Sequence, residues 1–268
     1  MMKRSGSANF NLRRLAGFIG GIFVVSALYM LIHTGIDYQK GPKVYQKLGQ
    51  AAVVDVGGGG SGGIGGESAG NSVQTGAESD CRSVEIDFTY LKGINEDIIG
   101  WLLFDHNGIS YPLLQGKDNQ EYLYTLADRT PNDAGSIFME SLCSPDFKDP
   151  HTILYGHNRK DGTMFGKLKW YGADPDYYKE NRFFTVYTPE GYFRYEVFAW
   201  YEAAQDDIAY QVGFAADEVF AEFVEKLWQR RSTDTKAAIG REDKIITLST
   251  CSVAGRRIVV HGKMIGGE

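Results

Sequence analysis

A segment dominated by glycine, GGGGSGGIGGESAGNS (57–72), divides this chain of 268 residues into two parts. Glycine loses more backbone entropy on ordering than any other residue and contributes no side chain to a core. We therefore expect a flexible tether here. The folded domain should begin near Cys81 and continue to the last residue, roughly 185 residues, which is enough for one sizeable core.

The part before the tether contains an uncharged apolar run, Leu15–Ile32. At about 1.5 Å of helix rise per residue, this run is long enough to cross a bilayer. Basic residues lie within positions 1–14, so the positive-inside rule keeps that end in the cytoplasm. The run exceeds the apolar core of a usual cleaved signal peptide, and no clear A-x-A site follows. We expect a single transmembrane signal anchor over 15–32, a juxtamembrane segment and tether over 33–80, and an extracellular domain over 81–268.

Charge and cysteine content narrow the class of protein. The formal net charge is −6 with acidic and basic residues interspersed, so no surface suited to nucleic acid is expected. The three cysteines, Cys81, Cys143 and Cys251, are too few for a disulfide framework. An odd count outside the cell leaves at least one thiol free. Either Cys81 pairs with Cys143 or all three are reduced, and the sequence allows both.

Short segments rich in β-branched and aromatic residues fill the domain, separated by turns. The pattern predicts strands over 98–104, 109–115, 135–140, 151–157, 183–188, 191–203, 244–251 and 256–265. It predicts helices over 85–97, 118–126, 163–171, 174–181 and 216–231. About eight strands, an N-terminal helix and a long helix before the last two strands indicate a mainly β fold with helices (α+β), built as a closed or nearly closed eight-stranded β-barrel.

The stretch TLSTC, Thr247 to Cys251, places a cysteine at the end of a predicted strand. Alternation puts Thr247, Ser249 and Cys251 on one face, and Leu248 and Thr250 on the other. Such a strand packs one side into a core and presents two hydroxyls and a thiol along a groove. A buried structural cysteine is the plain alternative. A reactive cysteine needs a base nearby and a donor for the oxyanion on an attacked carbonyl.

His157 is the best candidate base among the five histidines. It ends the predicted strand TILYGH and is followed by a polar loop, a position where strands deliver catalytic side chains. The other histidines lie at a membrane edge, in a polar turn, at a strand start and within the last strand: His33, His106, His151 and His261. A metal site built from histidine and cysteine has no recognisable ligand spacing to support it.

A candidate oxyanion donor follows the cysteine across a tight turn. Arg256 and Arg257 come just after Gly255, and a cation there can reach back to the groove that Cys251 faces. From residue types alone, a His–Cys–Arg site is one hypothesis among several.

Three blocks of sequence strengthen it. The segments ILYGHNRKDGTMFGKL (153–168), ITLSTC (246–251) and RIVVHGKMI (257–265) resemble the signatures of class B sortases. The resemblance covers nearly all of residues 85–268, keeps the family's order of His, Cys and Arg, and includes the family's layout of membrane anchor and tether.

The resemblance implies a cysteine transpeptidase at the Gram-positive cell surface, without a cofactor. Cys251 would attack the Thr carbonyl of a sorting motif and form a thioester, which a cell-wall amine would resolve. His157 would protonate the departing amine and deprotonate the incoming one. Arg257 would hold the oxyanion or the substrate backbone, and it precedes the IVV run as the family's arginine does.

The resemblance also implies a substrate groove. Positions that line the class B groove match Asn119, Leu123, Tyr210 and Ser249, while Thr250 is a lesser candidate because alternation turns its side chain away. Asn119 and Ser249 can hydrogen-bond an extended peptide, and the other two can form an apolar wall. As alternatives, Asn119 begins a helix, Leu123 is ordinary core and Tyr210 is a surface aromatic.

The chain departs from the family between the nucleophile and the arginine. Members usually have several more residues there, often with an acid directly after the cysteine, whereas here Ser252 follows and the link to Arg257 is short. Arg256 is therefore a rival. A pilin-polymerising sortase, another cysteine-dependent wall enzyme and an inactive binding module are alternative functions. The wall peptidases compared place Cys before His, L,D-transpeptidases carry both in one compact motif, and an inactive module would not need all three residues.

Overall fold

The structure is a computed structural model. It describes residues 6–55, 84–230, 239–240, 242–251 and 255–267, with the backbone alone described for residues 6–25, 33–34, 55 and 251.

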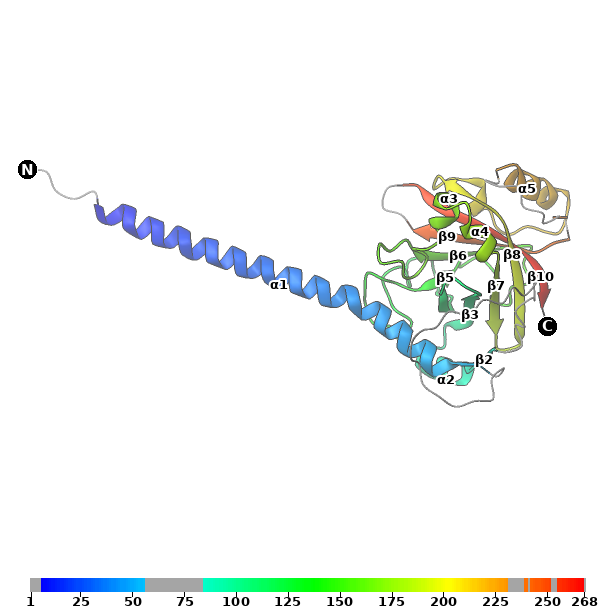
Figure 1. The fold of residues 1–268 in the computed structure, drawn as a ribbon, viewed down its shortest axis with the longest axis horizontal. Helices are drawn as coiled ribbons and strands as arrows, with labels where there is room; N and C mark the ends of the chain where they lie inside the picture. Colours follow the sequence, from blue (N-terminus) through cyan, green and yellow to red (C-terminus); the bar gives the residue numbers. More distant parts are fainter. Residues whose placement is uncertain (1–5, 56–83, 231–238, 241, 252–254, 268) are drawn as a thin grey trace, which may run out of the picture.

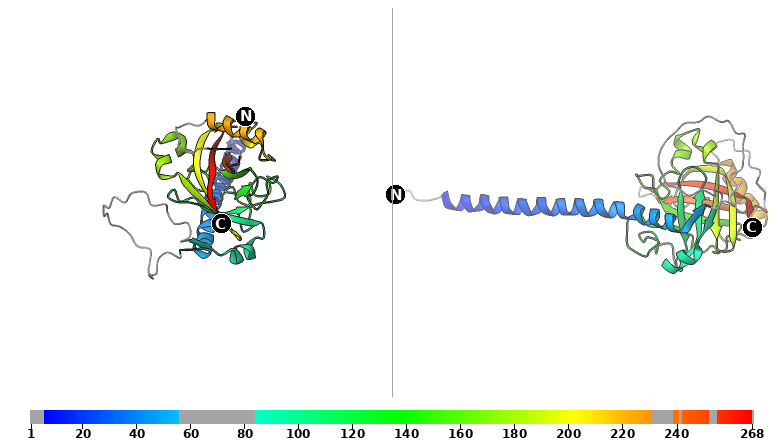
Figure 2. Two further views of the ribbon diagram at one scale, coloured as in Figure 1. Left: turned by 90° about the vertical axis from the view of Figure 1, so that its right-hand side faces the viewer. Right: turned by 60° about the horizontal axis from the view of Figure 1, so that its bottom comes forward.

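Eight strands form a closed barrel in the order β10-β8-β7-β3-β4-β5-β6-β9 (Figures 1 and 2). The strands are β3 (Ile98–Phe104), β4 (Ser110–Leu114), β5 (Ile137–Met139), β6 (His151–His157), β7 (Phe183–Thr188), β8 (Gly191–Ala203), β9 (Ile245–Cys251) and β10 (Arg257–Gly267). Neighbours pair antiparallel except β4 with β5 and β6 with β9, which are parallel. The prediction of an eight-stranded barrel is confirmed.

The barrel interior is packed with large apolar side chains. Leu102 and Phe184 are fully buried there, and the ring of Phe184 stacks between those of Phe104 and Tyr195. A Cβ added at Gly262 of β10 would lie 2.6 Å from the Phe184 ring, so only glycine lets that strand pass the stack. The barrel is therefore a core rather than a pore.

The helices lie outside the barrel: α2 (Phe88–Ile94), α3 (Trp170–Ala173), α4 (Tyr177–Glu180), the 3₁₀ turn η2 (Ile208–Tyr210) and α5 (Glu218–Gln229). The Asp217 carboxylate caps α5 by accepting from the amides of Val219 and Phe220. One face of α5 buries Phe220, Phe223, Val224 and Leu227 in a second apolar cluster with β8 and β10. The long helix predicted before the last two strands is present.

The predicted helix over 118–126 is wrong. An oxygen of Asp118 accepts from the amides of Gln120 and Glu121, which closes a local turn. The following residues then pair with one another, because the amide of Leu126 donates to the Thr130 carbonyl. These side-chain and turn hydrogen bonds compete with helix formation at an aspartate.

A long helix, α1 (Gly6–Ala52), extends away from the barrel and packs its last turns against it (Figures 1 and 2). Tyr45, Leu48 and Ala52 are buried in the main core. The packed unit therefore includes the last turns of α1. It starts before Cys81, whereas the sequence predicted a start near Cys81. The reason is that the apolar side chains within residues 45–52 pack against the surface of the barrel. Local composition does not reveal a contact with such a distant segment.

The glycine-rich segment and Cys81 lie outside the described residues, but the two ends of that region meet. β1 (Val53–Asp55) pairs antiparallel with β2 (Val84–Ile86), with Val53 opposite Ile86. The packing of α1, rather than the glycine-rich segment, therefore sets the distance between helix and barrel. In the part of the chain that the structure describes, we find no helix with the length and apolarity needed to cross a membrane. The anchor over 15–32 stays a prediction.

A buried polar chain links two histidines under α5. The Nδ1 of His151 lies 2.6 Å from the Gln211 carbonyl, and its Nε2 lies 2.7 Å from the Thr247 hydroxyl. The same hydroxyl lies 2.8 Å from Nδ1 of His261. Burial lowers the pKa of His151 to about 4 and that of His261 to about 3, the latter helped by its neighbour. Both imidazoles are therefore neutral in the folded state.

Stability should fall as the solution is acidified. Unfolded histidines bind protons below about pH 6.5, whereas these two take them up only near pH 4 or below, so the stabilisation is complete above pH 6.5. The free energy of unfolding should drop by up to about 1.4 kcal/mol per pH unit for each histidine between about pH 6 and 4. Urea denaturation at three pH values measures this, and His106→Ala, at an exposed histidine, should leave the slope unchanged. An unfolding free energy that stays constant below pH 6 would contradict the assignment.

Candidate active site

Two strands bring the predicted base and nucleophile together. β6 and β9 run parallel and pair residue by residue from His151 with Ile245 to His157 with Cys251. Neighbouring strands lie about 4.8 Å apart, so the last residues of both strands are adjacent although far apart in sequence. The predicted pairing of His157 with Cys251 follows from this register.

The surroundings of His157 set its protonation. Its Nε2 lies 2.6 Å from the Leu123 carbonyl oxygen, which can only accept, so Nε2 carries the proton. In the neutral ring Nδ1 is then free to accept a proton. The ring is half-buried and lies 5.4 Å from that of Tyr124. Burial lowers the pKa of His157, and the charge of Arg159 lowers it further, against the Leu123 hydrogen bond. The ring is therefore suited to act as a base near neutral pH.

A glycine allows the end of β6 to pack tightly. A Cβ added at Gly156 would lie 2.4 Å from Ile137 and 2.8 Å from the ring of Phe165. The amide of Phe165 donates to the His157 carbonyl at 3.0 Å. The end of β6 that carries the histidine is therefore held by the close packing at Gly156 and by the hydrogen bond from the Phe165 amide.

The two arginines after the turn have different surroundings. Arg256 is exposed and pairs with Glu202 at 3.2 Å. Arg257 is half-buried, and its guanidinium carbon lies 5.3 Å from the centroid of the Tyr210 ring. Its Nε is buried and finds no hydrogen-bond partner among the described residues. An unsatisfied donor beside the active strands is consistent with a role in holding a substrate oxygen, so the geometry favours Arg257.

Tyr210 connects Arg257 to the nucleophile strand. Its hydroxyl lies 3.0 Å from the Ser249 Oγ, two residues before Cys251. Burial raises the pKa of Tyr210, while Ser249 and Arg257 oppose the shift, so the hydroxyl stays protonated. Ser249 is fully buried beneath it. The tyrosine is therefore packed against β9 and partly buried, and it is not a surface aromatic.

Glu140 is a member of the site that the sequence did not reveal. It follows β5 and is 8% exposed, and both its oxygens lie 2.7 Å from the Asn119 amide nitrogen. The Asn119 carbonyl accepts from the amide of Ser141 at 2.8 Å. Asn119 therefore does not begin a helix, and its side chain is held in place. The only sequence signal was an acid directly after the apolar strand IFM.

The Glu140 carboxylate also holds a pair of stacked tyrosines, Tyr155 and Tyr210, through the first of them. The Tyr155 hydroxyl donates to Glu140 at 2.9 Å, and burial together with this negative neighbour raises the pKa of Tyr155. The rings of Tyr155 and Tyr210 stack with centroids 6.5 Å apart. Glu140 thus connects Asn119 with the stack beneath Arg257.

Thr250 and Leu123 were both predicted to line the substrate groove, and the structure shows contacts of each within the protein. The Thr250 side chain is fully buried, and its hydroxyl accepts from the amide of Ile258 at 2.8 Å, so Thr250 joins β9 to β10 and offers no atom to a groove. Leu123 is partly buried against the core, and its carbonyl is the partner of His157.

Cys143 is a free, buried thiol whose pKa burial raises to about 11, which makes it unreactive. Cys81 and the side chain of His33 lie outside the described residues. The described part of the chain contains no group of three histidine, cysteine or acidic side chains that could hold a metal ion.

Comparison with known proteins identifies the family. Residues 105–265 match the family described as "Sortase domain". Sortase B of Listeria monocytogenes is 34% identical over 179 residues, covering 65% of this chain and 72% of that protein. Sortase B from Bacillus anthracis in complex with AAEK1 superposes with a TM-score of 0.68 at 30% identity, covering 85% of this chain and 98% of that one. A Staphylococcus aureus sortase B–substrate complex gives a TM-score of 0.63 at 32% identity, covering 66% and 84%.

The family match spans more than half of the chain, and the solved relatives share its closed barrel. With His157 and Cys251 at the paired ends of β6 and β9, the chain belongs to the sortase family, in class B, and is a sortase-type cysteine transpeptidase.

Proposed function

We propose that this protein cleaves a C-terminal sorting motif of secreted proteins after Thr and transfers the new carboxyl end to an amine of the cell wall. The observation that carries the proposal is the register that pairs His157 with Cys251. Two relatives support the choice of substrates, a sortase B solved with its substrate and another complexed with triglycine.

The reaction divides into two acyl transfers. The Cys251 sulfur attacks the Thr carbonyl, its proton passes to Nδ1 of His157, and the C–N bond then breaks as that proton moves to the departing amine. A thioester remains. An incoming amine attacks the thioester and gives a proton to the same nitrogen, and the C–S bond breaks as that proton passes to the sulfur and restores the thiol. Arg257 donates to the carbonyl oxygen while that oxygen is negative.

The sorting peptide lies between the Asn119 side and the Tyr210 side of the site. Glu140 leaves the Asn119 amide oriented, so this residue can contact a peptide without a further loss of side-chain entropy. Tyr210 and Leu123 provide apolar surface, and Ser249 acts by holding the Tyr210 hydroxyl. Thr250 supports the nucleophile strand instead of contacting the peptide.

The proposed place of action is the outer face of the cell membrane, with the domain anchored through residues 15–32. The support is the uncharged run at Leu15–Ile32 behind a basic N-terminus. Class B relatives do not favour a pilin-polymerising role.

Replacement of the nucleophile and the base gives the central test. Cys251→Ala should abolish cleavage of a sorting-peptide library and the thioester adduct seen by mass spectrometry. His157→Ala should lower turnover by about 10²-fold, the usual cost of losing a general acid–base group. Cys143→Ala and His106→Ala are the matched controls and should keep activity. Normal turnover by Cys251→Ala would end the proposal.

A second comparison separates the arginines. Arg257→Ala should reduce turnover about a hundredfold or more, the scale of losing one oxyanion donor. Arg257→Lys should retain part of the activity, because lysine supplies the charge without the forked donors. Arg256→Ala removes only an exposed ion pair and should have little effect. A larger loss of turnover at Arg256 would reverse the assignment.

The role of Glu140 predicts a selective effect on substrate binding. Glu140→Gln places an amide against the Asn119 amide and leaves a buried donor unsatisfied, which costs about 1–3 kcal/mol. The peptide KM should therefore rise about tenfold or more, with a smaller change in kcat. Glu121→Gln, which keeps an oxygen for the Lys117 amide, is the control. Equal KM values for the two variants would show that Asn119 does not depend on Glu140.

A further inference from the structure

We propose that the part of α1 nearest the barrel is a positioning element of the active site, which braces the two loops on either side of His157. The inference rests on the proposed function of His157. It concerns the helix residues 37–45 and two loops, 158–164 after β6 and 124–136 after Leu123.

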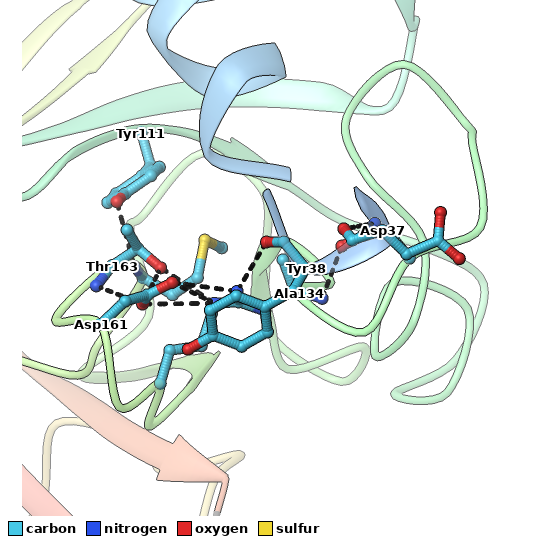
Figure 3. A network of polar contacts seen from close by, with 9 residues as sticks. Asp37, Tyr38, Tyr111, Ala134, Asp161 and Thr163 are labelled. Atoms are coloured by element: carbon cyan, nitrogen blue, oxygen red, sulfur yellow. Dashed lines mark hydrogen bonds and ion pairs between the residues drawn. The ribbon is translucent and has the colours of Figure 1, made fainter. Parts of the chain in front are cut away.

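The first loop is gripped through Arg159, two residues after His157. Arg159 is 6% exposed, and its Nη2 donates to the Tyr38 carbonyl of α1 at 2.9 Å (Figure 3). Its guanidinium carbon lies 3.9 Å from the centroid of the Tyr38 ring. The same group donates to Asp161 and to the Thr163 hydroxyl. One buried cation thus joins the helix to the loop.

A proline explains why the Tyr38 carbonyl is available. In an α-helix that carbonyl would accept from the amide four residues later, which here is Pro42, and proline has no N–H. Arg159 supplies the missing donor. The helix therefore continues through the Gly41-Pro42 pair, and the Tyr38 carbonyl, which has no intrahelical donor, accepts from Arg159 instead. Gly41 also permits close approach, because a Cβ there would lie 2.7 Å from that of Ala134.

Hydrogen bonds within the loop 158–164 and at its end connect the contact at Arg159 to His157. The amide of Met164 donates to the Tyr111 hydroxyl at 3.0 Å (Figure 3). The amide of Phe165 donates to the His157 carbonyl at 3.0 Å. Asn158 and Met164 form a β-bridge. Contacts therefore hold the loop next to His157, and the hydrogen bond from Arg159 holds it against α1.

The second loop carries the acceptor of the His157 ring. The Asn132 amide donates to the Asp37 carbonyl at 2.7 Å, and the Tyr45 hydroxyl donates to the Gly135 carbonyl at 2.6 Å. Gly135 lies directly against Leu123, since a Cβ at Gly135 would be 2.3 Å from the Leu123 carbonyl oxygen. That oxygen is the partner of Nε2 of His157. α1 therefore supports both the backbone and the ring of the histidine.

The test uses the full chain. Tyr38→Ala removes the ring under Arg159 and keeps the backbone carbonyl, whereas Tyr38→Phe keeps both. Tyr38→Ala should lower kcat about tenfold with little change in KM, as a small displacement of a catalytic group does. It should also shift the ¹⁵N NMR signals of the His157 imidazole, which report the surroundings of the ring directly. Tyr38→Phe should keep the parent kcat and signals, and Lys43→Ala, at an exposed position of α1, should leave both unchanged.

A second variant guards against misfolding. Pro42→Ala returns an amide to the helix, which competes with Arg159 for the Tyr38 carbonyl, so it should strengthen the helix yet shift the His157 signals in the same direction as Tyr38→Ala. Folded Tyr38→Ala and Pro42→Ala proteins whose His157 signals match the parent would overturn the inference. The NMR comparison does not require turnover, so loss of the brace is distinguished from failure of the proposed activity, which Cys251→Ala reports.

Discussion

The parallel pairing of β6 with β9 is the contact on which the active site depends. Residues 151–156 of β6 and 245–250 of β9 are buried, with Leu154 opposite Leu248 inside the barrel. A slip by one residue would turn every side chain to the opposite face and expose the apolar set, so burial fixes the register strongly. The same register places His157 beside Cys251. Parallel strands need a long crossover, and the chain supplies it with β7, β8 and α5. The core and the catalytic pair are thus products of one pairing.

Two networks of buried polar side chains hold the strands and loops around β6 and β9 in place. A carboxylate as enclosed as that of Glu140 is stable only with hydrogen-bond donors, and Asn119 and Tyr155 provide them. Further along the same face of β9, Thr247 bridges two neutral histidines. Each network ties strands that are distant in sequence. The first lies at the substrate side, so its loss should affect peptide binding, whereas the second lies under α5 and makes stability depend on pH.

The N-terminal helix adds a connection between the chain's first part and the chemistry. Because β1 pairs with β2, the glycine-rich region leaves and returns at one place. The helix itself contacts the loops beside His157 through Tyr38 and Tyr45. If α1 continues into a membrane, as proposed, the orientation of the domain relative to the bilayer and the position of the histidine are set by the same contacts.

The sequence by itself determined the strands, including the bounds of β3, β6, β7 and β8, because alternation and turn residues act over a few neighbours. It also determined the order of His157, Cys251 and Arg257. Only the tertiary structure decided that Glu140 holds Asn119, that the Thr250 hydroxyl accepts from the Ile258 amide, and that Arg159 donates to the Tyr38 carbonyl, to which Pro42 cannot donate. The partners in these contacts lie from a few to more than a hundred residues apart, and barrel closure and helix docking bring them together. Local periodicity carries no record of a hydrogen-bond partner supplied by a distant segment.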